Sequence, residues 1–111
     1  NGILISWAIE NVVKNAIDAL DNEGSITLKS KIDKKYIIIQ VEDSGKGILR
    51  KDWKNIFRPG FSTKEQGWGL GLSLTSRIIK EIHGGTIYVS KSQQDQGSII
   101  EILLPKLNNA N

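Results

Sequence analysis

The spacing of apolar residues changes along this chain, and that change constrains the fold more than any other feature. Residues 3–21 have the spacing of an amphipathic helix, with one apolar face formed by Ile5, Ile9, Val12, Val13, Ala16 and Leu20. Residues 26–32 and 36–43 have the shorter period and the isoleucine content of β-strands. A second helix is predicted over 70–83, with Leu74, Ile78 and Ile82 on one stripe, and two further strands over 86–91 and 98–104.

These elements, with a short helix near residues 52–57, predict an α+β two-layer sandwich with its helices on one face of a sheet. At 111 residues the chain forms one domain, covering 1–111. It has no cysteine and a single histidine, which excludes disulfide scaffolds, thiol catalysis and His-rich metal sites. Its first residue is Asn1 rather than methionine, so we expect a fragment of a longer protein.

The formal net charge of +3 comes from lysines and arginines that are scattered along the sequence. We therefore expect no nucleic-acid partner. The longest apolar run falls short of the ~20 residues of a membrane span. We expect no membrane contact from this fragment.

A polar stripe on the first helix is the first candidate site. Asn11, Asn15 and Asp18 are spaced i, i+4 and i+7 and lie opposite the apolar face. A solvent-facing stripe is the simple explanation, but such stripes usually carry lysine and glutamate, and asparagine is a poor helix former. Amide oxygens at this spacing would suit a hard cation.

Asp43 is the second candidate, because alternation along 36–43 places its carboxylate on the core side with Ile37, Ile39 and Val41. A turn-capping role in Asp43-Ser44-Gly45 and a role at the floor of a binding pocket are about equally favoured. On the last strand, Ser98 alternates in phase with apolar residues and is predicted to face the same interior.

A glycine-rich segment, residues 67–72, leads directly into the second helix. Backbone N–H groups exposed there would suit phosphate, although a flexible hinge is the usual explanation for such glycines. The preceding residues 57–64 lack periodicity and carry two phenylalanines and a lysine, which favours a lid over a linker.

Taken in order, these segments resemble the GHKL ATPase superfamily, and in particular the catalytic domains of bacterial sensor histidine kinases. Residues 10–16 (ENVVKNA) resemble the N box, and 43–48 (DSGKGI) the first glycine box. Residues 56–64 resemble the phenylalanine box with the Thr-Lys corner of the lid, and 67–73 (GWGLGLS) the second glycine box. The resemblance covers nearly the whole chain and implies a Bergerat fold, a sandwich with a mixed β-sheet that binds Mg-ATP.

The resemblance also implies roles for individual residues. Asn15 would ligate Mg²⁺, Asn11 would support the phosphates or the metal, and Glu10 would act as the base that polarises the phosphoryl acceptor. Asp43 would accept from the adenine amino group, aided by Ser98 through a water. Further nucleotide contacts are expected from Lys14, Gly45, Gly47, Ile48, Phe57, Arg58, Thr63, Lys64, Gly67, Gly69, Leu70, Gly71 and Leu72.

One departure from other branches favours a kinase over a hydrolase. Gyrase and the mismatch-repair ATPases usually carry glutamate four residues before the metal-binding asparagine, whereas this chain has Asn11 there and glutamate at position 10. Trp68 replaces a small residue of many relatives and is expected to pack the end of the lid. His83, before Gly84-Gly85, is expected to be structural and not the phosphoryl acceptor.

The expected function is transfer of the γ-phosphoryl group of ATP to a histidine on a separate dimerisation domain of the same protein. A response regulator would then receive the phosphoryl group. The alternatives are a GHKL serine kinase, an ATP hydrolase, or a nucleotide-binding module without transfer. A cytoplasmic location is expected, in a parent protein that could be membrane-anchored.

Overall fold

The computed structural model describes residues 2–20, 23–58, 71–82 and 84–106. The predicted first helix is α1, Gly2–Leu20. The four predicted strands are β1 (Ile26–Ile32), β2 (Tyr36–Asp43), β3 (Thr86–Gln93) and β4 (Gly97–Pro105). The predicted short helix is split into two 3₁₀ turns, Arg50–Asp52 and Asn55–Phe57.

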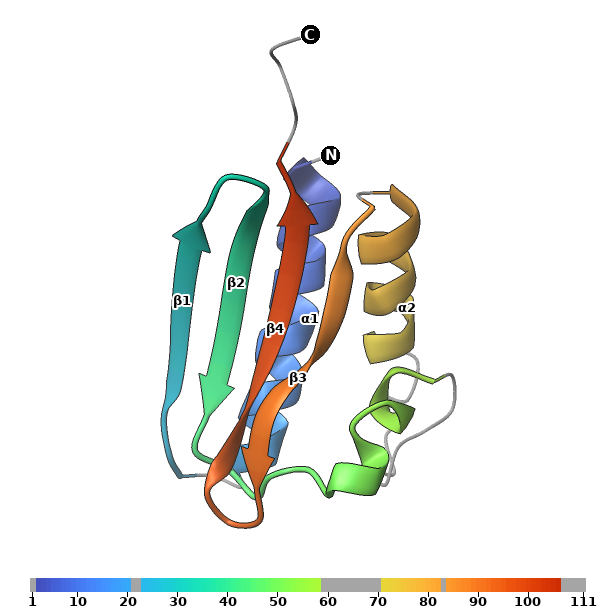
Figure 1. The fold of residues 1–111 in the computed structure, drawn as a ribbon. Helices are drawn as coiled ribbons and strands as arrows, with labels where there is room; N and C mark the ends of the chain where they lie inside the picture. The colour runs from blue at the N-terminus through green and yellow to red at the C-terminus, as the bar shows by residue number, and fades with distance from the viewer. Residues whose placement is uncertain (1, 21–22, 59–70, 83, 107–111) are drawn as a thin grey trace, which may run out of the picture.

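The four strands form one sheet in the order β1-β2-β4-β3 (Figure 1). All three pairings in the described residues are antiparallel, so the expected mixed sheet is wrong in this detail. β2 and β3 do run parallel to each other, as strands joined through a helix usually do. However, β4 lies between them and pairs with both.

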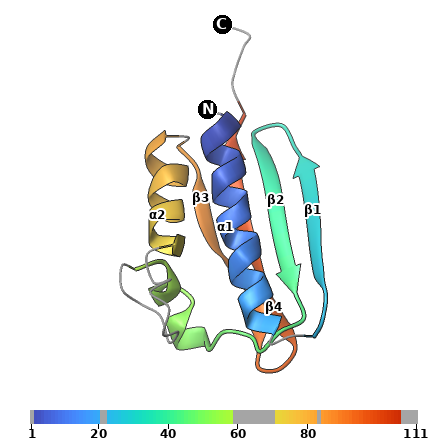
Figure 2. The same cartoon turned by 180° about the vertical axis from the view of Figure 1, so that it is seen from behind.

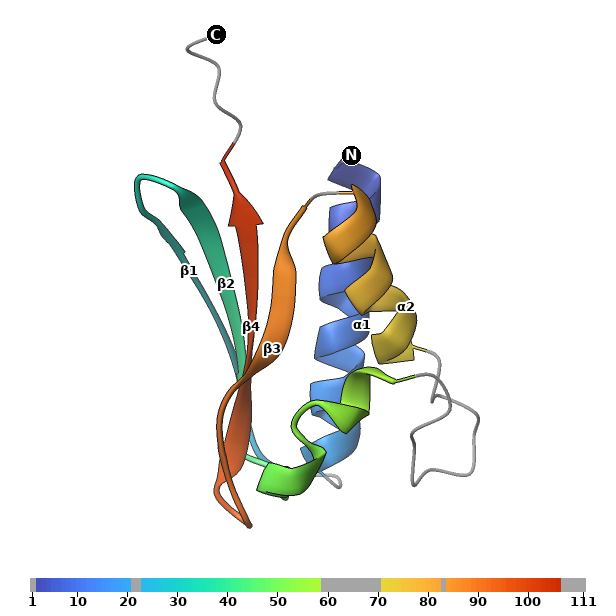
Figure 3. The same cartoon turned by 45° about the vertical axis from the view of Figure 1, so that its right-hand side comes forward.

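Both helices lie on the same face of the sheet (Figures 2 and 3), which confirms the two-layer α+β sandwich. The core between the layers is formed by Ala8, Val12, Ala16, Val41, Leu72, Ile79, Ile87, Val89, Ile100, Ile102 and Leu104. Ile37 and Ile39 pack against this core, as the alternation of β2 predicts. The opposite face of the sheet, called the outer face below, carries no helix in the described part of the chain.

The second predicted helix has two parts. It begins as the α-helix α2, Gly71–Arg77, and continues as a π-helical turn, Ile78–Ile82. Gly85 N–H donates to the Ile79 carbonyl at 2.9 Å, and Gly84 has a φ of 64°, so the glycine pair ends the helix as predicted.

The buried face of this helix differs from the prediction. Leu74 is 43% exposed, whereas Ile79 is fully buried, and Ser73, Thr75 and Ser76 are buried near it. Three small polar side chains are thus buried on α2 where apolar spacing predicts leucine. Thr75 satisfies its buried hydroxyl by donating to the Gly71 carbonyl at 2.7 Å.

No helix in the described residues is both long enough and apolar enough to cross a bilayer.

Candidate functional site

Asp43 lies at the end of β2, where its carboxylate is 6% exposed on the helix side of the sheet. Its Oδ1 accepts from the Gly45 N–H at 2.8 Å, and its Oδ2 accepts from the Ser98 hydroxyl at 2.9 Å. The turn-capping role is therefore confirmed. The Ser98 contact is direct, rather than through a water as the family resemblance implied.

These two hydrogen bonds do not exhaust the acceptor capacity of the Asp43 carboxylate. An ionised carboxylate has about four lone-pair sites, and the two bonds occupy one on each oxygen. Asp43 and Ser98 are also register partners on β2 and β4, so both backbones hold the pair in place. The site therefore offers a fixed, buried acceptor for a ligand N–H group.

The loop after Asp43 needs glycine because the backbone packs closely on two sides. A Cβ at Gly45 would lie 2.3 Å from the Ala19 carbonyl oxygen, and one at Gly47 would lie 2.2 Å from that of Gln93. Gly47 also has a φ of 83°. Both glycines are thus required by the packing of this loop against α1 and β3, whether or not a ligand binds.

Two residues that the sequence did not single out hold this loop. Ser92 Oγ accepts from the Ile48 N–H at 2.6 Å, and the Trp53 indole N–H donates to the Ile48 carbonyl at 3.0 Å. Ser92 faces the loop because β3 has an irregularity between Val89 and Lys91 that shifts the alternation by one residue. A bulge leaves no clear signal in the sequence, so this contact was not foreseeable.

Within the polar stripe of α1, Asn11 faces the start of α2. Asn11 and Asn15 are half-buried, whereas Glu10 and Lys14 are exposed. The Asn11 amide donates from Nδ2 to the Trp7 carbonyl at 3.1 Å. Its Oδ1 lies 3.8 Å from the position that a Cβ on Gly71 would take, so the amide oxygen is directed towards the first residue of α2.

The amide oxygens of Asn11 and Asn15 are hard ligands that suit Mg²⁺. Asn15 makes no side-chain hydrogen bond within the described residues. No group of three or more His, Cys, Asp or Glu residues is arranged to hold a metal in that part of the chain. The site therefore fits Mg²⁺ only if phosphate oxygens complete the ligand set, as is usual for this ion.

The other predicted contact residues are placed as follows. Ile48 and Phe57 are half-buried against the core, Leu72 is 8% exposed within it, and Arg58 is exposed. Thr63, Lys64, Gly67, Gly69, Leu70, Trp68 and His83 lie outside the described residues, and the predicted lid falls largely among them.

A cavity of about 170 Å³ opens at the Asp43 end of the sheet, and the strand register places Glu42, Lys91 and Ile99 of its lining on the outer face. Its lining residues are Glu42, Asp43, Lys91, Ser92, Gln93, Gln96, Gly97, Ser98 and Ile99. This volume is below the ~300 Å³ of a typical small-molecule pocket, so the cavity alone does not hold a whole nucleotide.

Residues 2–108 match the family of histidine kinase-, DNA gyrase B-, and HSP90-like ATPases. This chain belongs to that family. Among curated proteins, it is 37% identical over 95 residues to sporulation kinase C of Bacillus subtilis, covering 86% of this chain. It is 44% identical over 102 residues to the sensor histidine kinase ZraS of Salmonella typhi, covering 91% of this chain. It spans 22% of the length of each of these relatives.

Solved structures support the same assignment within the family. The nucleotide-free catalytic domain of histidine kinase ThkA superposes with a TM-score of 0.83 at 35% identity. The match covers 94% of this chain and 67% of that one. Full-length ShkA in complex with AMPPNP gives a TM-score of 0.81 at 26% identity, covering 92% of this chain and 21% of that one. The fold is thus that of histidine-kinase catalytic domains, as the motifs predicted.

Proposed function

We propose that this domain binds Mg-ATP and transfers the γ-phosphoryl group to a histidine on a separate dimerisation domain. The observation that supports this most is the buried Asp43 carboxylate, held by Ser98 and the Gly45 N–H with acceptor capacity to spare. Adenine presents an amino group where guanine presents a carbonyl oxygen. A fixed carboxylate therefore selects ATP over GTP.

The phosphates would lie between the polar stripe of α1 and the start of α2. Asn11 directs its amide oxygen towards Gly71, and Asn15 lies one helical turn further along the same stripe. These two residues would hold Mg²⁺ together with phosphate oxygens. When bound, the ion would neutralise charge on the transferring group.

The position of Glu10 favours transfer to a side chain over hydrolysis. Its carboxylate is exposed, while the residue that faces Gly71 is the amide Asn11. A carboxylate directed into the phosphate region would orient water, whereas an exposed carboxylate is accessible to an incoming imidazole. Glu10 would accept the imidazole proton as the phosphorus–nitrogen bond forms, while ADP leaves with the electrons of the broken bond.

The proposal extends to the parent protein. Sporulation kinase C and ZraS are several times longer than this chain, and histidine kinase ThkA has been solved in complex with a response regulator. We infer that the parent carries the acceptor histidine on a dimerisation domain and passes the phosphoryl group to a response regulator. ATP is a cytoplasmic substrate, so the domain would act in the cytoplasm.

Labelled ATP tests the proposal when the domain is mixed with a helical-hairpin dimerisation domain from one of the kinase relatives. Acid-labile, base-stable label on the acceptor histidine is expected. Label on serine would favour a serine kinase. Release of free phosphate without labelled protein would favour a hydrolase, and the absence of both labelled protein and free phosphate would favour a binding module. The domain without the hairpin should stay unlabelled, because its single histidine, His83, is not the expected acceptor.

Asp43→Asn tests the adenine contact separately. A charge-assisted hydrogen bond is worth about 1.5–3 kcal/mol, so ATP affinity should fall roughly tenfold to a hundredfold by calorimetry. Equal affinity of the unmodified domain for ATP and GTP would contradict the assignment.

A further inference from the structure

Four exposed lysines gather at one end of the sheet. Lys31, Lys34, Lys35 and Lys106 surround the turn between β1 and β2, and all four are exposed. Lys106 N–H donates to the Lys35 carbonyl at 2.8 Å, which brings the end of β4 against this turn. We call these four residues the lysine rim.

Asp33 is the acidic residue within this turn, and its carboxylate is already occupied. Its Oδ1 accepts from the N–H groups of Tyr36 at 2.7 Å and Lys35 at 2.8 Å, and these bonds hold the Asp33 pKa below its ordinary value. The lysine rim and Asp33 together carry +3, equal to the formal net charge of the chain. The other eleven basic and eleven acidic residues therefore balance.

An apolar surface adjoins the lysine rim on the outer face of the sheet. Strand register places Tyr36 opposite Pro105 and Ile38 opposite Leu103. Because Ile37 and Ile39 pack against the core, alternation along β2 puts Tyr36 and Ile38 on the side away from both helices. Tyr36 is 39% exposed, and Ile38 and Leu103 are half-buried. We call Tyr36, Ile38, Leu103 and Pro105 the apolar centre.

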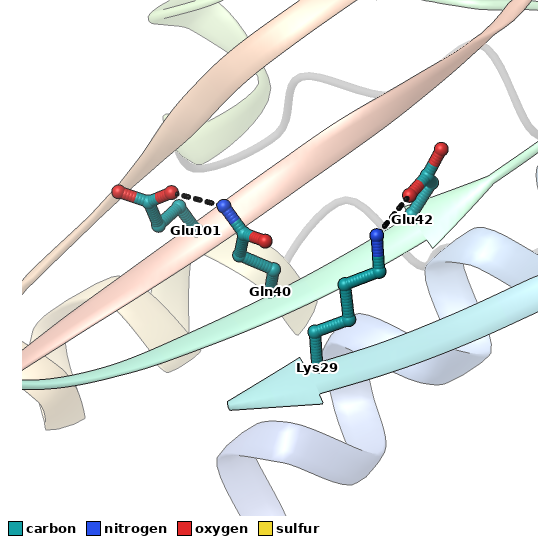
Figure 4. A network of polar contacts seen from close by, with 4 residues as sticks. All are labelled: Lys29, Gln40, Glu42 and Glu101. Carbon is teal, nitrogen blue, oxygen red and sulfur yellow. Dashed lines mark hydrogen bonds and ion pairs between the residues drawn. The ribbon is translucent and has the colours of Figure 1, made fainter. Parts of the chain in front are cut away.

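The middle of the same face is polar, and both of its glutamates have partners. Gln40 donates to Glu101 Oε1 at 2.7 Å, and Lys29 pairs with Glu42 at 3.7 Å (Figure 4). Tyr88 donates its hydroxyl to the other oxygen of Glu101. The lysine rim has no ion pair in the described part of the chain. Four exposed lysines around the single carboxylate of Asp33 thus leave an excess of positive charge at the hairpin end.

We propose that the outer face at this end docks an acidic protein surface, in which carboxylates meet the lysine rim and apolar side chains meet the apolar centre. An apolar centre with a charged rim is the usual anatomy of a protein interface. The proposal concerns a surface remote from the nucleotide site and does not depend on the proposed function.

The charge distribution favours a protein over a membrane or a nucleic acid. Glu101 lies on the same face, and its hydrogen-bond donors Gln40 and Tyr88 are uncharged, so a uniformly anionic bilayer or phosphate backbone would be repelled there. A protein surface places its carboxylates at the lysine end alone. Tyr36 is also the single aromatic residue of the apolar centre, whereas nucleic-acid platforms stack several bases.

The proposal is tested by titrating the ¹⁵N-labelled domain with a synthetic helical peptide that carries a leucine stripe and a glutamate cluster at one end. Saturable shift changes are expected at Tyr36, Ile38 and Leu103. A matched peptide with glutamine in place of glutamate should bind much more weakly. Phosphatidylglycerol vesicles and a single-stranded oligonucleotide serve as the two competing probes.

Lys34→Glu with Lys35→Glu should weaken peptide binding about tenfold, because two attractive contacts become repulsive. Lys51→Glu with Lys54→Glu makes the same change in net charge at exposed residues of the segment after β2, at the opposite end of the molecule from the β1–β2 turn (Figure 1), and should leave binding unchanged. The spectra of both variants report whether the fold is retained. Equal weakening in both variants, no saturable shifts, or tighter binding to vesicles or oligonucleotide would overturn the proposal.

Discussion

The Ser98 hydroxyl donates to Asp43 Oδ2 at 2.9 Å, although the two residues are 55 positions apart in the sequence. The contact joins the last strand to the strand that precedes the glycine loop. It orients one carboxylate oxygen while the Gly45 N–H orients the other. The proposed adenine acceptor is therefore positioned from two elements at once.

Ser98→Ala should lower the free energy of unfolding by about 1–3 kcal/mol, because a buried carboxylate oxygen loses its donor. Urea denaturation measures this directly. Ser30→Ala, which removes the same hydroxyl from an exposed position on β1, should change stability by less than about 0.5 kcal/mol. Similar losses in the two variants would show that the Ser98–Asp43 contact is not special.

Gly47→Ala should destabilise the domain more than Gly84→Ala. Both glycines have positive φ, which costs an alanine about 1–2 kcal/mol. A Cβ on Gly84 meets no atom within 4 Å, whereas one on Gly47 would lie 2.2 Å from the Gln93 carbonyl oxygen. Chemical denaturation of both variants separates the conformational cost from the clash, and equal losses would argue against the close packing of this loop.

Ile79→Ala and Leu74→Ala test which face of α2 is buried. Ile79 is fully buried, so its truncation should cost about 2–5 kcal/mol. Leu74 is 43% exposed, so its truncation should cost less than about 1 kcal/mol. A larger loss of stability in Leu74→Ala than in Ile79→Ala would show that the buried face is the one centred on Leu74, as apolar spacing predicts.

Tyr88 makes the stability of the domain depend on pH in the alkaline range. Burial, together with the hydrogen bond and the charge of Glu101, raises the Tyr88 pKa from 10.0 to about 12. The folded state thus keeps the phenol proton more firmly than the unfolded chain. This contribution is complete below pH ~10 and is lost as the pH rises towards ~12.

Denaturation midpoints measured across this pH range should fall less steeply for Tyr88→Phe than for the unmodified domain. Tyr36→Phe serves as the matched control and should preserve the steeper slope. An unchanged slope in Tyr88→Phe would contradict the role of the Glu101 contact.

Asn15→Ala should reduce ATP affinity in the presence of Mg²⁺ more than in its absence, because it removes an amide ligand and leaves Asp43 intact. Adenosine, which has no phosphates, should bind the variant and the unmodified domain equally. Calorimetry with both ligands makes the comparison. Asn55→Ala, a half-buried asparagine outside α1, is the control. A loss of adenosine affinity in Asn15→Ala would place Asn15 at the base pocket instead of the metal.

Much of this protein follows from local patterns in the sequence. Helical spacing indicated α1, and strand alternation placed Val41 and Asp43 on the core side of β2. The glycine pair at 84–85 marked the end of the second helix. Each of these features depends on residues that are close together in the sequence, so their spacing and conformational preferences are sufficient to predict it.

Tertiary structure decided the rest, because those contacts join segments that are far apart in the chain. Alternation predicted that Ser98 faces inward, but only the β2–β4 register places its hydroxyl on Asp43. Likewise, the packing of α2 buried Ser73, Thr75 and Ser76 and left Leu74 exposed. β4 lies between β2 and β3 and pairs antiparallel with each, so these two parallel strands are not neighbours. Pairing order and the buried face of a helix depend on how whole elements pack together, and no local pattern encodes them.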